Sequence, residues 1–501
     1  MGKDKFSIRD VFVIGGGING AGIARDAAGR GLTVTLAEKD DLAAHTSSAS
    51  SKLIHGGLRY LENYEFRLVR ESLKERETLW KAAPHLISPL RFILPHHKAM
   101  RPAFILRLGL FLYDYIGGRE ILPPTRTRNL LTHESGAPLS DTLTKGFEYS
   151  DCWVDDARLV CMIAKDASER GANILVGHEV VTANRRDSLW TITTQSADGT
   201  LTQHQARTLV NAAGPWVDTL EEKASPAPKS KKKIRMVKGS HIVVPKLYEG
   251  AQAYTFQNND NRVVFAVPYE ENYTLIGTTD VPFSDDPSEV QISRDEENYL
   301  CEAASRYFKN PISLKDIIWS YAGVRPLVDD GAANASKTTR DYVLELDTQE
   351  NAPLLSIYGG KITTFRCLSE EALHMLQPHL GFSVGNWTRD AVLPGGDMGL
   401  ENFPAYAENL RREYSWVPSD LLVRFAKAYG TNSHKILKGH SALADLGQHF
   451  GAGFYEAELC YMCAEEWVRT AEDALWRRSK RGLHMSNDER ASVEKWFSKK
   501  V

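Results

Sequence analysis

A glycine-rich turn followed by an acidic residue has the spacing of a dinucleotide-binding site. Asp10–Ile14 is an apolar, β-branched run that predicts a strand, and it leads into the GxGxxG pattern of residues 15–20. A helical segment follows, and a second strand over Thr33–Leu36 leads to Glu38. The glycines permit a tight turn and let the backbone approach a pyrophosphate at the helix N-terminus, while the acid can bind ribose hydroxyls. The cofactor-binding residues predicted here are Gly15, Gly16, Gly17, Asn19, Gly20 and Glu38.

Three later segments are suited to the flavin part of such a cofactor. Small hydroxyl residues and paired glycines fill residues 46–60, an apolar strand ends in small residues at 210–216, and GGKITT spans 359–364. Hydroxyls and backbone N–H groups can bond phosphate or flavin oxygens, and glycines let the backbone approach a flat ring. The residues predicted to bind cofactor in these segments are Thr46, Ser47, Ser48, Ser51, Lys52, Leu53, His55, Gly56, Gly57, Ala213, Gly214, Trp216, Gly360, Lys361 and Thr363.

These segments belong to a larger set of motifs that spans essentially the whole chain. The most telling are HGGLRYLE (55–62) and GVRPL (323–327), accompanied by GGGINGAG (15–22), NAAGPWV (211–217), KGSHIVVP (238–245), IGTTDV (276–281) and TRDY (339–342). With them the chain resembles the FAD-dependent glycerol-3-phosphate dehydrogenases of the respiratory, bacterial aerobic type. The resemblance implies FAD as cofactor, oxidation of sn-glycerol 3-phosphate to dihydroxyacetone phosphate, ubiquinone as electron acceptor, and a homodimer. We expect the FAD to be bound non-covalently, with covalent attachment through His55 as the alternative.

The resemblance also selects substrate-pocket residues. Arginine suits a phosphate dianion because its planar fork can make bidentate hydrogen bonds. By resemblance, the substrate contacts are Arg59, Tyr60, His241, Arg325, Arg340 and Lys361. Hydride transfer from C2 to the flavin also requires loss of the hydroxyl proton, for which His241 is the first candidate base and His55 the second. Arg325 is a poor base but can stabilise developing alkoxide charge.

The order of the motifs predicts interleaved domains in a mixed α/β fold. We expect a Rossmann-like FAD-binding domain from residues 1–60, 150–232 and 320–385. Residues 61–149 and 233–319 then supply a substrate-binding domain, whose alternating strands Ser240–Pro245, Arg262–Pro268 and Tyr273–Thr278 predict an antiparallel sheet. Residues 388–501 predict a helical C-terminal domain that includes a long amphipathic helix over Tyr455–Arg478, and Ala224–Lys233 predicts a surface loop.

Composition and hydropathy suggest a cytoplasmic protein at a membrane surface. The net charge of −3 gives no electrostatic case for nucleic-acid binding. We expect no secretory signal, since residues 1–9 are polar, and no spanning helix. The 14 apolar residues of Ala103–Ile116, flanked by basic residues, suit an interfacial helix on anionic lipid at the inner face of the cell membrane. A core or dimer-interface helix is the alternative.

Other activities remain open at this point. A glycerol-3-phosphate oxidase, which reduces oxygen to hydrogen peroxide, would share most motifs. An amino-acid oxidase-like enzyme would share the N-terminal unit, and a non-catalytic flavin-binding protein is disfavoured by the clustered Arg, His and Lys motifs. An NAD-dependent dehydrogenase would leave the later motifs without a use. We expect no metal site, since Cys460 and Cys463 lack partner ligands nearby and favour core packing on a helix.

Overall fold

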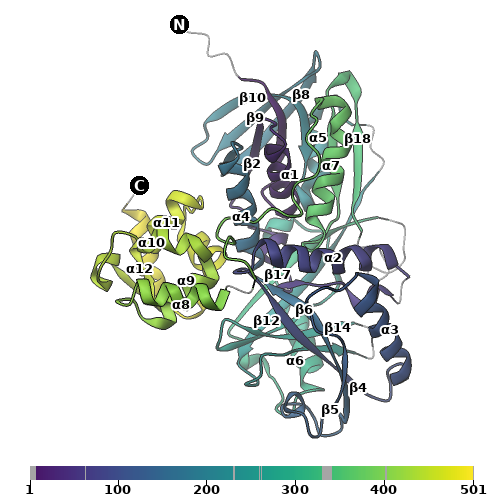
Figure 1. Cartoon of the computed structure of the whole chain (residues 1–501). Coiled ribbons are helices and arrows are strands. Elements are labelled where there is room, and N and C mark those ends of the chain that lie inside the picture. Colours follow the sequence, from purple (N-terminus) through teal and green to yellow (C-terminus); the bar gives the residue numbers. More distant parts are fainter. Residues whose placement is uncertain are drawn as a thin grey trace.

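The computed structural model describes residues 7–61, 64–228, 232–258, 260, 262–329, 341–400 and 403–499. Two large sheets form the body of the protein, one above the other in Figure 1. A cluster of helices near the C-terminus lies beside them, against α4 (Asp156–Glu169). The predicted mixed α/β fold with a helical C-terminal part is confirmed.

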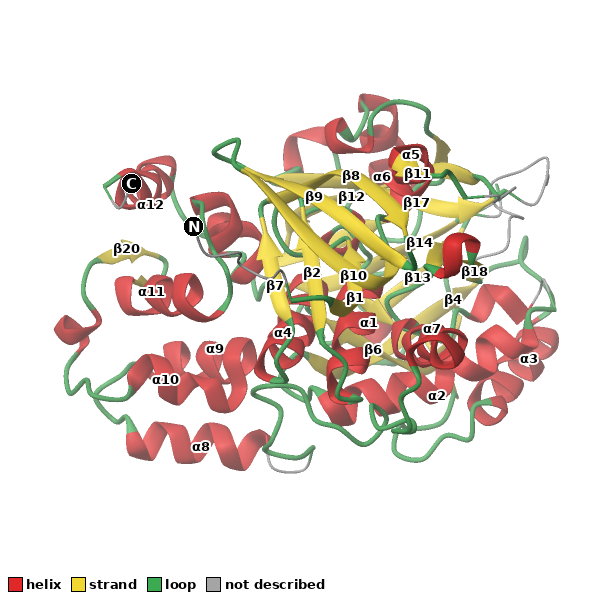
Figure 2. Cartoon of the chain, turned by 90° about the horizontal axis from the view of Figure 1, so that it is seen from above, coloured by secondary structure: helices red, strands yellow, loops and turns green. Residues whose placement is uncertain are grey.

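The first sheet has a parallel centre that carries the glycine-rich turn. Its strands run in the order β7-β2-β1-β10-β19, and α1 (Ile18–Gly29), α4 and α7 (Phe365–Leu380) lie together on one side of them (Figure 2). Central strands of this kind are covered on both faces and therefore read as continuous apolar runs, as in Val11–Val13, which are fully buried. The strands of this sheet are β1 (Arg9–Ile14), β2 (Val34–Glu38), β7 (Asn173–Val176), β8 (His178–Arg186), β9 (Leu189–Ser196), β10 (Leu201–Asn211), β11 (Ala224–Ser225), β18 (Val343–Asp347) and β19 (Leu354–Tyr358).

The second sheet is antiparallel except where β4 runs parallel to β13. The predicted strands over 240–245, 262–268 and 273–278 correspond to β12 (Ile234–Pro245), β14 (Val263–Tyr269) and β15 (Tyr273–Gly277), which pair antiparallel as expected, with residues 262 and 278 one position outside the observed strands. Helix α6 (Arg294–Ser305) covers this sheet and begins at a capping box between Ser293 and Glu296. The strands are β3 (Leu53–Ile54), β4 (Ile87–His96), β5 (Arg126–Asn129), β6 (Lys145–Val154), β12 (Ile234–Pro245), β13 (Ala253–Gln257), β14 (Val263–Tyr269), β15 (Tyr273–Gly277), β16 (Val281–Pro282) and β17 (Trp319–Val328). Strands β6 and β17 cross the predicted domain limits at residues 150 and 320.

Three further helices lie around the two sheets. Helix α2 (Phe66–Ala82) crosses between them and α3 (Ala103–Ile116) lies at the outer edge of the second (Figure 1), while α5 (Val217–Lys223) follows β10. The predicted surface loop Ala224–Lys233 begins with β11, and its residues 229–231 lie outside the described part.

The C-terminal cluster has its own apolar core, which includes Phe425 and Met462. The long helix predicted over Tyr455–Arg478 is wrong: α11 ends at Glu465, and a π-helical turn over Asp473–Arg478 follows a break. The reason is that Trp467 has φ of +57°, while the carboxylate of Glu466 turns away to pair with Arg158 on α4. The elements are α8 (Phe403–Glu413), α9 (Ser419–Tyr429), α10 (Ser433–Leu437), β20 (His449–Gly451), β21 (Phe454–Tyr455), α11 (Glu456–Glu465) and α12 (Asn487–Ser498).

Candidate active site

The turn between β1 and α1 borders a first cavity of about 310 Å³. The backbone at Gly15 has φ of +108°, and a Cβ there would lie 2.5 Å from the carbonyl oxygen of Ala212. A Cβ at Gly20 would lie 1.9 Å from the Gly15 carbonyl oxygen. The two glycines therefore allow β1, α1 and the end of β10 to meet at this cavity.

Most predicted dinucleotide contacts line this first cavity. The side-chain amide of Asn19 donates to the Gly359 carbonyl (3.1 Å), while its Oδ1 is buried without a hydrogen-bond partner among the described residues. An acceptor left open on a cavity wall fits a ligand that brings its own hydroxyl or N–H donors. The predicted residues on these walls are Gly15, Gly17, Asn19, Glu38, Thr46, Ser47, Ala213, Gly214, Trp216 and Gly360.

Glu38 ends β2 at the edge of the same cavity. One carboxylate oxygen accepts the backbone N–H of Gly16 (2.6 Å) and the other accepts that of Asp40 (2.9 Å). Burial raises the pKa of Glu38 above its usual value, although these two N–H groups favour the ionised form. The carboxylate is thus fixed in direction, with acceptor capacity left for ribose hydroxyls.

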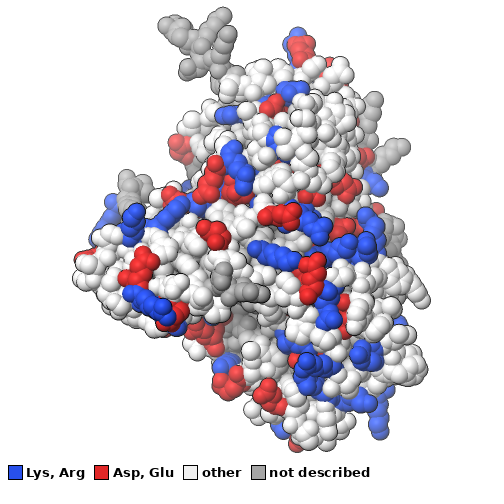
Figure 3. Space-filling model, viewed as in Figure 1, with Lys and Arg blue, Asp and Glu red and all other residues white. Residues whose placement is uncertain are grey.

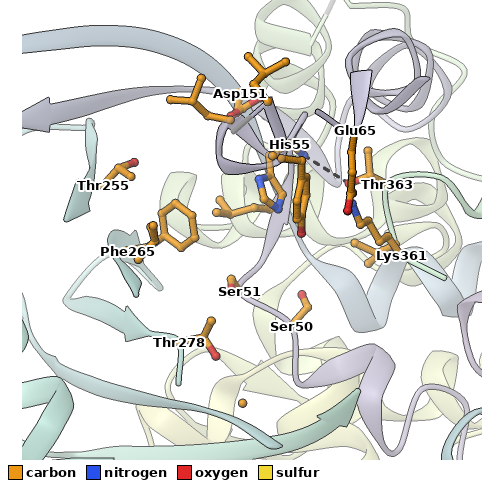
Figure 4. A pocket seen from close by; sticks show the side chains of 18 of the residues that line it. Ser50, Ser51, His55, Glu65, Asp151, Thr255, Phe265, Thr278, Lys361 and Thr363 are labelled. Carbon is orange, nitrogen blue, oxygen red and sulfur yellow. Dashed lines mark hydrogen bonds between the residues drawn. The ribbon is translucent and has the colours of Figure 1, made fainter. Parts of the chain in front are cut away.

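A second cavity of about 520 Å³ continues from the first, and Thr46, Ser47 and Gly360 line both. Figure 4 shows His55, Ser51, Phe265 and Thr363 arranged around it, from segments far apart in the sequence. The backbone N–H of His55 donates to Thr363 Oγ1 (3.4 Å). The predicted residues on its walls are Thr46, Ser47, Ser51, Leu53, His55, Gly57, Tyr60, His241, Arg325, Gly360, Lys361 and Thr363. Two joined cavities of this kind fit an extended cofactor with a nucleotide half and a ring half.

His241 on β12 is buried at the wall of the second cavity. Its Nε2 lies 2.9 Å from Ser51 Oγ, and its ring stacks on Tyr321 at 4.8 Å between centroids. Its Nδ1 has no hydrogen-bond partner among the described residues. Burial, assisted by the charges of Arg325 and Lys52, lowers the pKa of His241 well below its usual value. The imidazole is therefore neutral near pH 7 and able to accept a proton.

Two basic side chains share this wall. The guanidinium of Arg325 on β17 pairs with Asp280 (2.6 Å) and donates to Thr278 Oγ1 (2.8 Å). Lys361 Nζ lies 3.7 Å above the ring of Tyr60, within the range of a cation–π contact. The second cavity thus brings together positive charge and a neutral imidazole, which together can hold an anionic alcohol and take up its hydroxyl proton.

Some predicted residues lie elsewhere. Lys52 has its ammonium group buried against Asp156, with both carboxylate oxygens at 2.8 Å, rather than on a cavity wall. Gly16, Gly20, Ser48 and Gly56 likewise support the walls without lining them, as far as the described residues show. The predicted contact Arg340 lies outside the described residues, and Arg59 is described only for its backbone, in a short helical turn over Leu58–Leu61.

Sequence reasoning left several wall residues unassigned. Thr278 and Asp280 belong to the IGTTDV motif, which was recognised in the sequence. Their role as hydrogen-bond partners of Arg325 was not predicted. Phe265 on the wall, and Tyr321, which stacks on His241 without lining the cavity, had no signal in the sequence, because the antiparallel pairing of distant strands brings them here.

Two properties of the described residues concern metals and membranes. No group of three or more His, Cys, Asp or Glu side chains there has an arrangement that could hold a metal ion, and no helix there is long and apolar enough to cross a membrane. Cys460 and Cys463 lie on α11 as predicted, but the expected core packing is wrong for Cys460, which is exposed because it faces away from the core of the C-terminal cluster.

Comparison with known proteins agrees with this geometry. Residues 10–366 match the family described as FAD dependent oxidoreductase, and residues 386–497 match the C-terminal domain of alpha-glycerophosphate oxidase. The chain is 52% identical to the D-erythritol 1-phosphate dehydrogenase of Brucella abortus (97% of both chains) and 50% identical to the glycerol-3-phosphate dehydrogenase of Pseudomonas aeruginosa (98% of this chain and 95% of that one). The crystal structure of the glycerol-3-phosphate dehydrogenase from Bacillus halodurans complexed with FAD superposes with a TM-score of 0.78 at 28% identity, over 98% of this chain and 94% of that one. The chain therefore belongs to the family of FAD-dependent oxidoreductases that includes the glycerol-3-phosphate dehydrogenases, as its motifs predict, and its cofactor is FAD.

Proposed function

We propose that this protein oxidises sn-glycerol 3-phosphate at C2 to dihydroxyacetone phosphate and passes the electrons to a membrane quinone. The observation that carries the proposal is the second cavity, where Arg325, Lys361 and His241 meet beside the predicted flavin segments. Cationic groups suit a phosphate dianion, and the neutral imidazole suits the hydroxyl proton. FAD, when bound, supplies the acceptor for the hydride that leaves C2.

The chain's own residues divide the remaining work. Lys361 holds the phosphate, together with Arg59 and Arg340, which are assigned by their motifs alone. His241 takes the hydroxyl proton, and its position is fixed by Ser51 and Tyr321. The dianionic phosphate raises the pKa of His241 on binding and so strengthens it as a base. Arg325, already oriented by Asp280 and Thr278, stabilises negative charge that develops on the substrate oxygen.

A four-carbon polyol phosphate is the second candidate substrate. It is favoured by the relative named D-erythritol 1-phosphate dehydrogenase, whose identity to this chain (52%) is slightly higher than that of the Pseudomonas aeruginosa glycerol-3-phosphate dehydrogenase (50%). Both substrates need the same phosphate-binding side chains and the same base. They differ in the length of the carbon chain beyond the reacting carbon. The two are therefore separated by kinetics on the same preparation.

Quinone reduction is supported by α3. Three of its large apolar side chains are exposed to solvent: Phe104 (74%), Leu108 (60%) and Tyr115 (56%). Several such side chains on one helix indicate a surface that binds a partner or a membrane. Leu108 and Leu112 also line the second cavity, so the apolar surface is continuous with the flavin side of the site. A lipid-soluble quinone entering past α3 would reach that cavity without crossing water.

Basic residues surround this helix. Figure 3 shows Lys and Arg side chains gathered over α3, β4 and β5 at the lower right of the view. The exposed residues Lys98 and Arg101 come shortly before α3 in the sequence, and the exposed Arg126 begins β5. An amphipathic helix with a basic surround binds anionic lipid through apolar burial and charge together. We infer a peripheral position on the inner face of the cell membrane.

The first experiment is anaerobic absorbance of the FAD-loaded protein before and after addition of glycerol 3-phosphate. Bleaching of the flavin bands is expected, with slower bleaching by D-erythritol 1-phosphate. Bleaching by neither compound would refute the proposed reaction. Reoxidation by a soluble ubiquinone analogue rather than by oxygen is expected, whereas rapid reoxidation by oxygen with hydrogen peroxide formation would make the enzyme an oxidase.

The membrane proposal is tested by cosedimentation with vesicles of phosphatidylglycerol and phosphatidylcholine. The Phe104→Ser/Leu108→Ser double variant should lose binding. The matched control is Leu131→Ser/Leu201→Ser, which replaces residues of similar exposure (60% and 62%) away from α3 and should bind like the unchanged protein. Equal binding by all three would refute the role of α3, and conversion of a dimer to a monomer by the α3 variant alone would make it a subunit interface.

A further inference from the structure

A short segment of the C-terminal cluster forms ion pairs and hydrogen bonds with the loop that follows Glu38. The segment is the π-helical turn Asp473–Arg478, and the loop is residues 39–45, between β2 and the turn at Thr46. The two are more than 400 residues apart in the sequence, and the C-terminal cluster contributes no residue to the lining of either cavity as described. Its contact with the loop is therefore separate from the site itself.

In this contact, arginine side chains bind two consecutive loop residues, Asp40 and Asp41. Arg478 makes a bidentate pair with Asp41, with Nη1 and Nη2 each 2.8 Å from a carboxylate oxygen. Arg477 Nε reaches the same carboxylate at 2.6 Å. Arg469, four residues before the π-helical turn, donates through Nη2 to the backbone carbonyl of Asp40 at 2.8 Å. The side chains of Asp41 and Arg478 are 2% and 0% exposed, so these bonds are screened little by solvent.

The two arginines stabilise the ionised carboxylate of Asp41 in this arrangement. Burial alone would raise its pKa, but Arg478 and Arg477 together lower the pKa of Asp41 below its usual value. Two arginines on one buried carboxylate leave it ionised and fully hydrogen-bonded. Removing that charge would leave the buried guanidinium of Arg478 without its carboxylate partner, and would take from Arg477 one of its carboxylate partners, the other being Asp473.

The loop connects this contact to the first cavity. Residues Lys39, Ala43, Ala44 and His45 of the loop line the cavity, next to Glu38 at the end of β2. The backbone N–H of Ala43 donates to the Gly16 carbonyl (3.1 Å), and that of Asp40 donates to the Glu38 carboxylate. A shift of the loop would thus move the wall of the cavity and release one hydrogen bond of Glu38.

We propose that Arg477 and Arg478 of the C-terminal cluster act through Asp41 as positioning residues for FAD, by holding loop 39–45 in the conformation that binds the nucleotide half. They touch the loop and not the cavity, so their contribution is to prepare the site before the cofactor arrives. The C-terminal cluster is then part of the cofactor site in function, although it lines none of it.

The test is titration of the full-length apoprotein with FAD, followed by quenching of flavin fluorescence. Asp41→Asn keeps the shape of the side chain and removes its charge, and the FAD dissociation constant should rise about tenfold or more. Arg477→Gln is the milder second variant: it leaves the Arg478 pair in place and should give a smaller rise in the same direction. An unchanged dissociation constant in both variants would overturn the proposal.

A matched control separates positioning from general damage to the C-terminal cluster. Glu458 is a buried carboxylate held bidentately by Arg424 (2.6 and 2.7 Å) entirely within the cluster. Glu458→Gln makes the same chemical change away from the loop and should leave FAD affinity within about twofold. An equal loss in Glu458→Gln and Asp41→Asn would overturn the proposal in favour of global destabilisation.

Hydrogen exchange of the apoproteins gives a second readout. Faster exchange confined to loop 39–45 in Asp41→Asn, with α1 unchanged, is expected. If Asp41→Asn fails to fold, the same comparison is made between Arg477→Gln and the unchanged protein. Loop exchange that is identical in the two would overturn the proposal.

Discussion

Replacing Glu38 by glutamine should weaken FAD binding by a factor that the structure allows to be worked out. An ionised carboxylate offers about four acceptor positions. Two are occupied by the backbone N–H groups of Gly16 and Asp40, one on each oxygen, which leaves two for ribose hydroxyls. A glutamine amide has one oxygen only, so its NH₂ group must face one of these N–H donors.

The cost follows from the bonds that glutamine cannot make. At least one backbone N–H loses its acceptor, and one ribose hydroxyl loses a charge-assisted bond. A hydrogen bond to a charged group contributes about 1.5–3 kcal/mol, and about 1.4 kcal/mol corresponds to tenfold in affinity. Glu38→Gln should therefore raise the FAD dissociation constant about 10- to 100-fold.

The assay is fluorescence titration of apoprotein with FAD, with Glu179→Gln as control. Glu179 lines the same cavity but is half exposed and pairs with Lys223 at the surface, so its loss should change affinity less than about twofold. Because burial raises the pKa of Glu38, FAD affinity of the unchanged protein should also fall as the pH decreases toward that raised pKa. Glu38→Gln should show no such dependence. Affinity of Glu38→Gln within twofold of the unchanged protein would refute the reasoning.

Three further outcomes are expected. Gly20→Ala should give a protein without flavin absorbance, because its Cβ would lie 1.9 Å from a carbonyl oxygen, whereas Gly385→Ala, with no atom within 4 Å of its Cβ, should bind FAD normally. Lys52→Met should lower stability to denaturant by about 3–5 kcal/mol by leaving Asp156 buried and unpaired, and Lys52→Met/Asp156→Leu should recover most of it; equal losses in both would contradict this. Burial and the charge of Arg158 lower the pKa of His85 to about 3, so the folded protein binds fewer protons there than the unfolded chain between pH 3 and 6.5. Stability should then fall as pH decreases below 6.5, by up to about 1.4 kcal/mol per pH unit from this group, and His85→Gln should flatten that part of the profile measured by denaturant unfolding.

The glycine-rich turn and the cavity beside it were predictable because their signals are local. A strand, three spaced glycines, a helix and an acid lie within thirty residues, and each has one dominant physical role. The structure places Gly15, Gly17 and Glu38 at one cavity accordingly. Helix α3 also has the predicted limits, Ala103–Ile116, since its apolar run is bounded by Pro102 and Gly117.

The features that the sequence did not predict depend on contacts between residues far apart in the chain, which a local sequence pattern does not encode. Lys52 lies in a segment suited to cofactor binding, yet its charge is used by Asp156, 104 residues later. The break after α11 follows from the pairing of Glu466 with Arg158, 308 residues earlier. The exposure of α3 could not be read from its composition, because a buried helix and an interfacial helix have the same apolar content.

The order of strands in the first sheet has a consequence for protein synthesis. Strand β1 is made first, but its neighbour β10 ends at Asn211, and the next strand, β19, ends at Tyr358. At a translation rate of about 5–20 residues per second, the ribosome needs roughly 20–70 s to progress from the glycine turn to Thr363, the last described residue that lines the second cavity. During this time the edge of β1 that pairs with β10 stays uncovered until Asn211 has been made, and the walls of the second cavity stay incomplete until the end of the interval. Chaperone binding to nascent chains should therefore be concentrated on this interval, and free FAD should protect the chain from proteolysis only once the segment through Thr363 has emerged.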